Sequence, residues 1–413
     1  MIKGKTGLYS NAGQIANLVA LHSRFPLAGD THNCLLTADP ALLEYLLSVL
    51  RENQSMPPAR SVEEWQRFLS TLNCHSARPI LTFHLLKQPA DLQPPSHVFD
   101  WLRRELFRSA AGVMREDRVL STLLERLHDR AIVPLLLKGA ALSRTVYPDP
   151  ALRLSSDIDM LVREDDLEPC YEVITGMGYR SPYDFHSFSR FTTPHQVFLP
   201  LPDTPMAKPL EIHWGIGQGF AQDQERLDGL FSRSISVPYS AFEFRTLSHV
   251  DHLAFCSHHA IYHHGDEVRL SWIYDLSCLS KMLTPTDWQV LPERAVAYRA
   301  RKATEIGLLM AAAWTGTPKL PEQGFFECWP EPTKAELSDW DCVAYQGASK
   351  LQLMKMQLHF IPSFTGKAKY LLDSVFPPRD KIRFDCGEPD PPQHLRSLGS
   401  TYLHDWLWYW KHK

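Results

Sequence analysis

Two kinds of hydrophobic pattern divide the chain. In residues 39–128 apolar side chains recur every three to four positions, which is the spacing of an amphipathic helix. Asp39 before Pro40, and Ser61 three residues before Glu64, are helix-start signals because their side chains bind the first free backbone N–H groups. We therefore expect helices at about residues 40–50, 61–72, 77–86 and 99–128.

Short apolar runs without helical periodicity follow in the middle of the chain. The runs at 132–137 and 157–162 are rich in Ile, Leu and Val, which favours strands that are covered on both faces. Further extended segments fall at 188–201 and around Glu211. Helices are expected between them at 140–147 and 165–177. This alternation indicates a small mixed sheet with helices on one side, not a doubly wound fold.

Helical periodicity returns after residue 240. Ser248 and Asp251 have the spacing of another capping pair, and Gly265 is a helix-stop signal. Further helices are expected at 269–282, 287–298, 303–314 and 337–356. The first 35 residues carry no sustained apolar face. We therefore predict an α+β fold in four parts: an N-terminal extension at 1–35, a helical domain at 36–128, an α/β core at 129–240 and a helical C-terminal region at 241–413.

The composition limits the class of protein. Among 413 residues 44% are hydrophobic and 22% are charged, as in an ordinary globular protein, and the net charge is −4. This charge argues against a dedicated nucleic-acid binder but leaves local contacts with RNA open. The eight cysteines form no Cys-x-x-Cys pair, and no apolar stretch approaches the ~20 residues of a membrane span. We expect a soluble, cytoplasmic chain with reduced cysteines.

The candidate chemistry begins with two carboxylates on an apolar strand. Asp157 and Asp159 alternate with Ile158 and Met160, so both acids point to one face, about 6–7 Å apart along the chain. Such neighbours repel one another unless a cation lies between them or they face solvent at a strand end. Mg²⁺ prefers oxygen ligands of this kind together with substrate phosphates. The pattern is short, and a cap at Asp157 with an exposed Asp159 would also explain it.

Two further patterns point to phosphate and metal binding. The apolar run ending at Leu137 is followed by Lys138 and Gly139, and a glycine at the start of a helix lets backbone N–H groups approach an anion. Glu211 and His213 share one face of a later strand. A third carboxylate beside the first two would complete a site for two metal ions.

These patterns together resemble a largely uncharacterised bacterial nucleotidyltransferase family of the DNA polymerase β-like superfamily. The motifs that carry the resemblance are Leu137–Gly139, Arg153, Asp157–Met160, Gly178–Tyr179 and Glu211–Trp214. The resemblance covers about residues 35–385 and is clearest over 130–280. The chain departs from the wider superfamily at its phosphate turn, where Ala140 stands in place of a second glycine or a serine.

The resemblance implies a metal-dependent transferase with a small nucleotidyltransferase core. Two Mg²⁺ ions, with Mn²⁺ as a substitute, would be held by Asp157, Asp159 and Glu211. The nucleoside triphosphate, with ATP as the expected one, would be contacted by Lys138, Gly139, Arg153, Ser156 and His213. A nucleoside monophosphate would pass to an acceptor hydroxyl, with release of pyrophosphate. The acceptor stays open between a small molecule, a peptide or protein hydroxyl and an RNA end.

Two other hypotheses remain. A nucleotide-sugar glycosyltransferase could use Asp-x-Asp with Mn²⁺, but it leaves Lys138 and Glu211 without a role. A non-catalytic nucleotide-binding module on a degenerate scaffold is compatible with the altered turn, while the three intact acids argue against it. Release of pyrophosphate would distinguish nucleotidyl transfer from both of these hypotheses.

A histidine-rich stretch at 248–264 has no single explanation. His252, His259 and His263 fall on one helical face, and the last two have a spacing that could ligate zinc. A polar face toward the cleft and a locally bonded, structural face are the other hypotheses. Asp275, on the next predicted helix, could pair with a histidine or with Arg269.

Overall fold

The computed structural model describes most of the chain between residues 38 and 376. The described residues are 38–182, 195–202, 208–215, 224–240, 242–263, 268–320, 324–334, 336–337, 354, 358, 361 and 364–376. The predicted extension at 1–35 lies outside them, as do most of the predicted helix at 337–356 and the helix stop at Gly265.

Four N-terminal helices form where the apolar pattern predicted them. They are α2 (Pro40–Leu50), α3 (Val62–Cys74), α4 (Arg78–Leu86) and α5 (Ser96–His128). The Asp39 carboxylate accepts the N–H groups of the first turn of α2, and Ser61 and Glu64 form a reciprocal capping box on α3. All four expected helices are thus confirmed, and the two predicted capping signals have the expected geometry.

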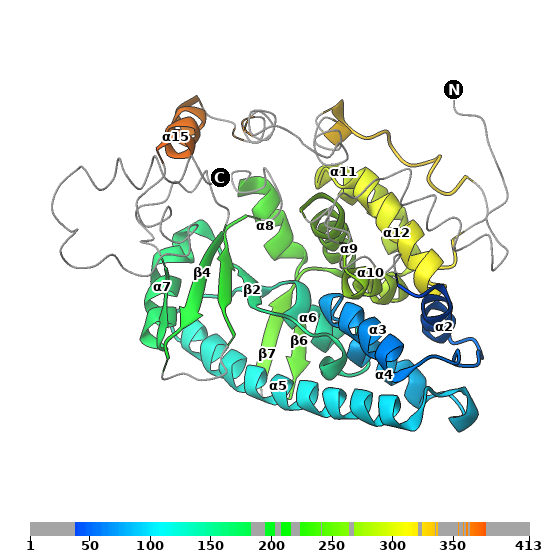
Figure 1. Ribbon diagram of the computed structural model, residues 1–413. Coiled ribbons are helices and arrows are strands. Elements are labelled where there is room, and N and C mark those ends of the chain that lie inside the picture. Colours follow the sequence, from blue (N-terminus) through cyan, green and yellow to red (C-terminus); the bar gives the residue numbers. More distant parts are fainter. Residues whose placement is uncertain are drawn as a thin grey trace.

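A seven-stranded mixed sheet forms the centre of the molecule (Figure 1). Its strands are β1 (Leu135–Leu136), β2 (Ile158–Leu161), β3 (Tyr179–Arg180), β4 (His195–Pro200), β5 (Leu210–His213), β6 (Ile235–Tyr239) and β7 (Phe242–Thr246). The order is β3-β4-β5-β2-β1-β7-β6. The pairs β2–β5 and β1–β7 are parallel, and the others are antiparallel. An α+β fold with a mixed sheet is thus confirmed.

The sheet is larger than the sequence indicated. The β6–β7 hairpin was not predicted, and β7 pairs with β1 beyond residue 240, where we had ended the core. Its turn has no Asn-Gly or Gly signal, and Ser240 takes a positive φ of 48° instead. The expected strand at 132–137 is only two residues long, since Pro134 has no N–H to pair with a neighbour.

Helices lie on both faces of the sheet, which corrects the one-sided arrangement that we expected. The C-terminal half of α5 and helix α7 (Leu167–Gly176) pack against one face, where Ile158, Met160 and Ile212 are buried. On the other face Leu135 and Leu161 join a separate apolar cluster made by the helical parts of the chain. Helix α6 (Lys138–Thr145) contributes to both clusters.

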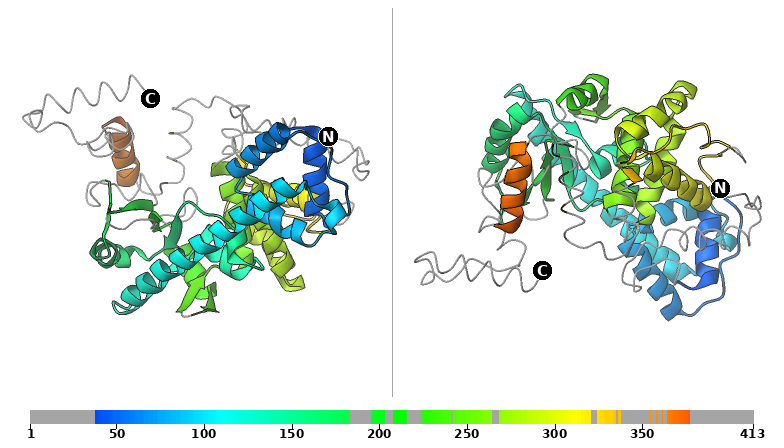
Figure 2. Two further views of the ribbon diagram at one scale, coloured as in Figure 1. Left: turned by 60° about the horizontal axis from the view of Figure 1, so that its bottom comes forward. Right: turned by 90° about the horizontal axis from the view of Figure 1, so that it is seen from above.

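The N-terminal and C-terminal helices share one apolar core. The later helices are α8 (Gln224–Arg233), α9 (His249–His258) with a π-helical continuation at His259–His263, α10 (Leu270–Met282), α11 (Pro285–Ala297), α12 (Arg301–Thr315) and α15 (Phe364–Val375). Residues of α2, α4, α9, α10 and α12 belong to the same buried cluster, and the two groups of helices lie side by side in both views of Figure 2. None of the described helices is long and apolar enough to cross a membrane.

Candidate active site

The parallel pairing of β2 and β5 brings the acids of two motifs together. Asp159 and Glu211 are direct partners in the register, and His213 lies opposite Leu161 on the same strand pair. His213 Nε2 lies 2.9 Å from Asp159 Oδ1 and 3.6 Å from Glu211 Oε2. Asp159 and His213 are buried, while Glu211 is half-buried at the margin. The three side chains therefore form one polar cluster on an otherwise apolar sheet.

Lys138 supplies the positive charge in this cluster. It is the first residue of α6, shortly after β1, and has a positive φ of 43°, a conformation that is uncommon for a residue with a side chain. Its Nζ donates to Asp159 Oδ1 at 2.7 Å, and its backbone N–H donates to Nε2 of the buried His252 at 3.2 Å. His252, from the histidine-rich stretch, thus holds the turn that positions Lys138.

Gly139 is required by close packing. A Cβ built at this position would lie 2.7 Å from the Cβ of Ser155, which is closer than side-chain carbons approach. Ser155 belongs to the loop that leads into Asp157. The glycine therefore lets the phosphate turn predicted from the sequence lie directly against the loop of the two aspartates.

The charges of the cluster stabilise one another. Burial acts to raise the pKa of Asp159, but the Lys138 ammonium and the hydrogen bond from His213 outweigh it and hold this pKa well below its usual range. Burial acts to lower the pKa values of Lys138 and His213, and the carboxylates outweigh it and raise both. Asp159 is therefore an ionised carboxylate held by the Lys138 ammonium and the His213 ring.

Asp157 is the carboxylate of the cluster whose pKa is raised. Burial, followed by the charges of Asp159 and Glu211, raises its pKa, and the opposing effects of Lys138 and of the 3.0 Å hydrogen bond from Ser156 Oγ are smaller. The repulsion that the sequence predicted for both aspartates thus applies to Asp157, while Asp159 is neutralised by its partners. An added cation would relieve the remaining excess of negative charge.

Three donor groups converge closely enough to hold one metal ion. One oxygen each of Asp159 and Glu211 and a ring nitrogen of His213 all lie within 4.8 Å of one another. Among the described residues this group contains His213 and not Asp157, whose role as a metal ligand stays a prediction. Two carboxylates are a donor set suited to Mg²⁺ or Mn²⁺, whereas an imidazole ligand is more typical of zinc or iron.

Arg153 forms its ion pair with a carboxylate outside this cluster. Its Nε and Nη2 donate to the two oxygens of Asp275 at 2.8 and 2.9 Å, and both side chains are buried. Tyr147 Oη donates to the same carboxylate at 2.7 Å. Asp275 thus pairs with Arg153, not with a histidine or Arg269 as we expected. This pair joins α10 to the loop before Asp157. The phosphate contact of Arg153 stays a prediction.

The comparison with known families agrees with this geometry. A family model described as an uncharacterised nucleotidyltransferase matches residues 61–316, which is more than half of the 413-residue chain. The chain belongs to this family. None of the curated proteins matches the chain. Membership of the nucleotidyltransferase family supports nucleotidyl transfer as the general type of reaction, and the matched range contains every residue of the polar cluster.

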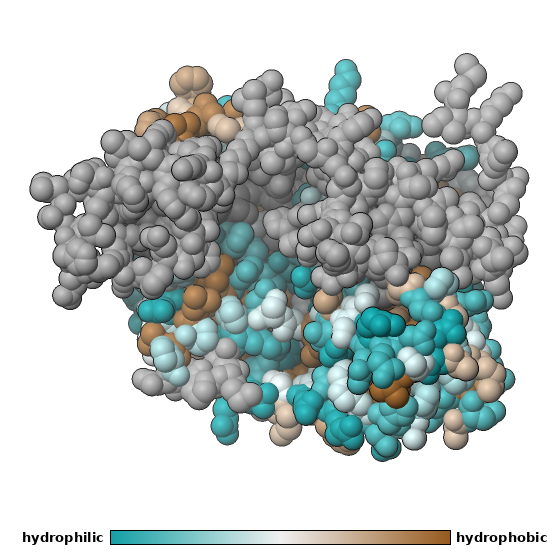
Figure 3. Space-filling model, in the orientation of Figure 1, coloured by the Kyte–Doolittle hydropathy of each residue, from teal (hydrophilic) through white to brown (hydrophobic). Residues whose placement is uncertain are grey.

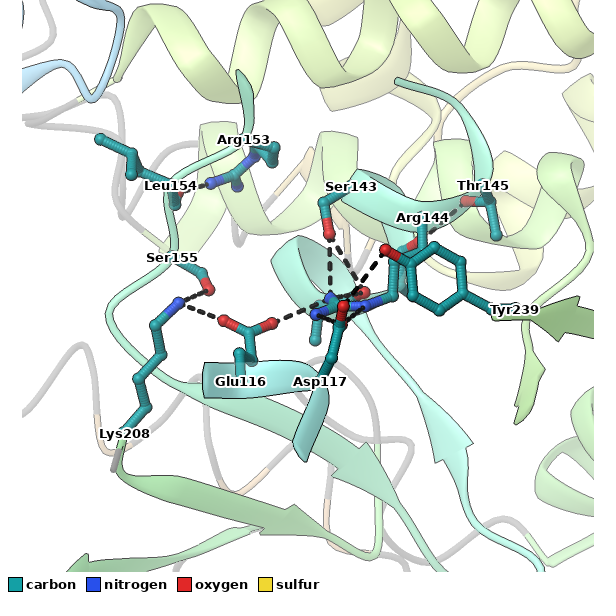
Figure 4. A network of polar contacts seen from close by, with 12 residues as sticks. Glu116, Asp117, Ser143, Arg144, Thr145, Arg153, Leu154, Ser155, Lys208 and Tyr239 are labelled. Atoms are coloured by element: carbon teal, nitrogen blue, oxygen red, sulfur yellow. Dashed lines mark hydrogen bonds and ion pairs between the residues drawn. The ribbon is translucent and has the colours of Figure 1, made fainter. Parts of the chain in front are cut away.

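A second network of charges joins elements that carry the candidate site (Figure 4). Glu116 of α5 accepts a hydrogen bond from Arg144 of α6 at 2.8 Å and another from Lys208 Nζ. Lys208 Nζ also donates to Ser155 Oγ at 3.1 Å, and Arg144 reaches Asp117 as well. Glu116 thus connects the helix after the phosphate turn, the loop before Asp157 and the segment before β5.

Sequence reasoning missed this network because its members are far apart in the chain and form no motif. It also missed His195, whose ring centroid lies 5.1 Å from that of His213. Burial, followed by the charge of His213, lowers the pKa of His195 to about 4, so this ring is neutral. The only available signal was its place on an extended segment beside the Glu211 strand.

Proposed function

We propose that this chain transfers a nucleoside monophosphate from a nucleoside triphosphate to an acceptor hydroxyl in a reaction that depends on a divalent metal ion. The observation that carries the proposal is the pairing of Asp159 with Glu211 in register, with Asp157 directly before strand β2 and the Lys138 ammonium against Asp159. Mg²⁺ is the expected ion and Mn²⁺ a substitute, since the cluster offers mainly carboxylate oxygens.

Asp157, Asp159 and Glu211 are assigned to hold the metal, as two ions in the complete complex. Bound metal would neutralise the triphosphate and lower the pKa of the acceptor hydroxyl. Asp157 suits this role because burial, followed by the charges of Asp159 and Glu211, raises its pKa, and a bound cation would favour its ionised form. His213 donates to Asp159 at 2.9 Å and is assigned to orient that carboxylate.

Lys138 and the turn at Gly139 are assigned to bind the triphosphate. Lys138 Nζ would contact phosphate oxygens near its present partner Asp159, and the N–H groups at the start of α6 would contribute the partial positive charge of a helix N-terminus. The missing hydroxyl at Ala140 makes these two groups the main phosphate contacts of the turn. ATP is the expected nucleotide.

The proposed reaction forms a bond between the acceptor oxygen and the α-phosphorus and breaks the bond from that phosphorus to the pyrophosphate oxygen. Glu211 is assigned to take the proton of the acceptor hydroxyl, because it lies at the margin of the cluster and is more exposed than Asp159. Ionised Asp159 keeps its partners in place during this step. Lys138 balances the negative charge on the leaving pyrophosphate.

The test measures two products at once. The purified full chain is incubated with each α-labelled nucleoside triphosphate, Mg²⁺ and a small-molecule, protein or RNA fraction of a cell extract. We expect transfer of the α-label to one fraction together with stoichiometric pyrophosphate, and neither with Asp159→Asn. Sugar transfer from a nucleotide sugar would favour the glycosyltransferase hypothesis, and binding without either product would favour a non-catalytic module.

A further inference from the structure

The exposed face of α5 has an unusual composition. The helix buries one side in the two cores, through Leu102, Leu120 and Leu123 among others. The opposite side carries Phe107 and Met114, with 72% and 75% of their surfaces exposed. Exposed residues of this size are ordinary when isolated, but these two lie seven residues apart on one helix and so point the same way, about 10 Å apart along the axis.

Five arginines surround these two apolar side chains. All are exposed and, at 3.6 residues per turn, all fall on the outer half of the helix; they are Arg103, Arg104, Arg108, Arg115 and Arg118. The carboxylates of Glu116 and Asp117 turn inward to Arg144. At the N-terminal end Glu105 pairs with Arg108 and Asp100 lies 4.0 Å from Arg103, but no described residue forms an ion pair with Arg104, Arg115 or Arg118.

A solvated helix face normally mixes the two signs of charge, because like charges at neighbouring positions repel. Here a cationic strip about 22 Å long lies on a chain whose net charge is −4. In the view of Figure 3 hydrophilic side chains predominate along the lower edge of the molecule, where Figure 1 places α5 in the same orientation. The strip is therefore a local feature and not part of a generally basic surface.

The apolar positions have the spacing of a helix-packing seam. Phe107, Ala111 and Met114 stand at i, i+4 and i+7, with Arg104 and Arg118 continuing the seam at either end. Arg108 and Arg115 flank it at the positions that select the charge of a partner helix. Phenylalanine, methionine and arginine are the residue types enriched in protein interfaces, where lysine is depleted, and this face has no lysine.

We propose that this face of α5 docks an acidic amphipathic helix of a partner protein. The apolar side of that helix would cover Phe107, Ala111 and Met114, and its flanking glutamates or aspartates would pair with Arg108 and Arg115. A second copy of this chain does not fit, because equivalent arginines would face one another. RNA is a poorer fit, because its phosphate backbone would leave the apolar seam uncovered. A lipid surface is also a poorer fit, because only two large apolar side chains are available to insert into it.

The test uses the full chain and a labelled three-heptad peptide with leucine at the seam positions and glutamate at the flanking positions. A second peptide has lysine in place of glutamate. Fluorescence anisotropy measures binding, and single-stranded RNA and anionic vesicles are tested under the same conditions. We expect binding of the glutamate peptide only. Arg108→Glu/Arg115→Glu should weaken it at least tenfold, and Phe107→Ala/Met114→Ala should do the same because the seam is removed.

The matched control is Arg67→Glu/Lys281→Glu, which changes the net charge equally at exposed cations of α3 and α10 and should leave peptide binding unchanged. Thermal melts establish that each variant is folded. Four results would overturn the proposal: no binding of the glutamate peptide, equal weakening by the control pair, unchanged binding by Phe107→Ala/Met114→Ala, or tighter arginine-dependent binding of RNA or vesicles. None of these results depends on whether the chain transfers nucleotides.

Discussion

At the scale of single residues, the site contains its own hydrogen-bond donors for the buried carboxylate of Asp159. Lys138 and His213 both donate to the same oxygen of Asp159, so this buried carboxylate is stable in the absence of a metal ion. Asp157 has only the Ser156 hydroxyl as a close partner among the described contacts, and its pKa is raised by burial and by its acidic neighbours. The two aspartates of one motif therefore have different energetic roles, which their sequence spacing does not distinguish.

Lys138→Ala should weaken binding of a nucleoside triphosphate at least tenfold and leave binding of the matching nucleoside unchanged, because only the phosphates would contact its ammonium group. Calorimetric titration of both ligands measures this difference. Since the change also leaves Asp159 with one cation fewer, a melt of the variant must accompany the titration. Equal weakening for nucleoside and triphosphate would mean that the lysine has a structural role.

Gly139→Ala should disturb the site through the 2.7 Å approach of its Cβ to Ser155. We expect a loss of about 1–3 kcal/mol in the free energy of unfolding, the usual cost of an overpacked site, together with weaker triphosphate binding. Gly176→Ala is the matched control, since a Cβ there meets nothing within 4 Å at the end of α7. A Gly139→Ala variant as stable as the control would contradict the packing argument.

At the scale of elements, local sequence signals predicted individual helices and strands well, but they did not predict how the strands pair. The caps at Asp39 and Ser61 and the acids on β2 and β5 follow from sequence spacing alone. Nothing in the spacing states that β2 and β5 are parallel neighbours, which is what makes Asp159 and Glu211 partners. The β6–β7 hairpin was missed because its turn has no glycine or asparagine signal. The ion pair of Arg153 with Asp275 was not predicted because the two residues are 122 positions apart in the chain.

Glu116→Gln should be strongly destabilising, because Glu116 is the buried carboxylate between Arg144 and Lys208. We expect a loss of roughly 3–5 kcal/mol, as for other broken buried ion pairs, measured by urea unfolding. The exposed pair of Arg130 and Glu172 provides the control, and Glu172→Gln should cost less than about 1 kcal/mol. Similar losses for the two variants would show that the network does not hold the three elements together.

At the scale of the whole molecule, helices from both ends of the chain form one core around part of the sheet. The sequence separated a helical domain at 36–128 from a C-terminal region at 241–413, but residues of α2 and α4 are buried together with those of α9 and α10. One contact across this interface is the 2.9 Å hydrogen bond between His84 Nε2 and Tyr274 Oη. Such contacts between distant segments cannot be predicted from hydrophobic periodicity, because periodicity indicates only which face of a helix is apolar.

Burial of His84 in the shared core should make the folded protein less stable at acidic pH. Burial lowers the pKa of His84 from 6.5 to about 4. The unfolded chain therefore binds this proton more tightly, and the stability from His84 is complete above about pH 6.5 and is lost as the pH falls toward 4. This loss is about 3 kcal/mol for a shift of this size. Urea unfolding of wild type and His84→Gln at pH 7 and pH 5 should show the wild-type advantage shrinking, and a constant difference would contradict a neutral, buried His84.

The central claim is that Asp157, Asp159 and Glu211 hold a metal ion for a nucleoside triphosphate, and the most direct test is a set of thermal melts. Wild type, Asp157→Asn and Asp159→Asn are compared in EDTA and in Mg²⁺ with ATP. In EDTA, Asp157→Asn should be at least as stable as wild type because a repelled charge is removed, while Asp159→Asn should be less stable because Lys138 and His213 lose their ionised partner.

Addition of Mg²⁺ and ATP should raise the melting temperature of wild type only, by an amount that corresponds to about 2.7 kcal/mol at a hundredfold excess over the dissociation constant. Neither variant should gain stability, although one of them begins as stable as wild type. An Asp157→Asn variant that gains as much as wild type from Mg²⁺ and ATP would contradict the proposed metal site.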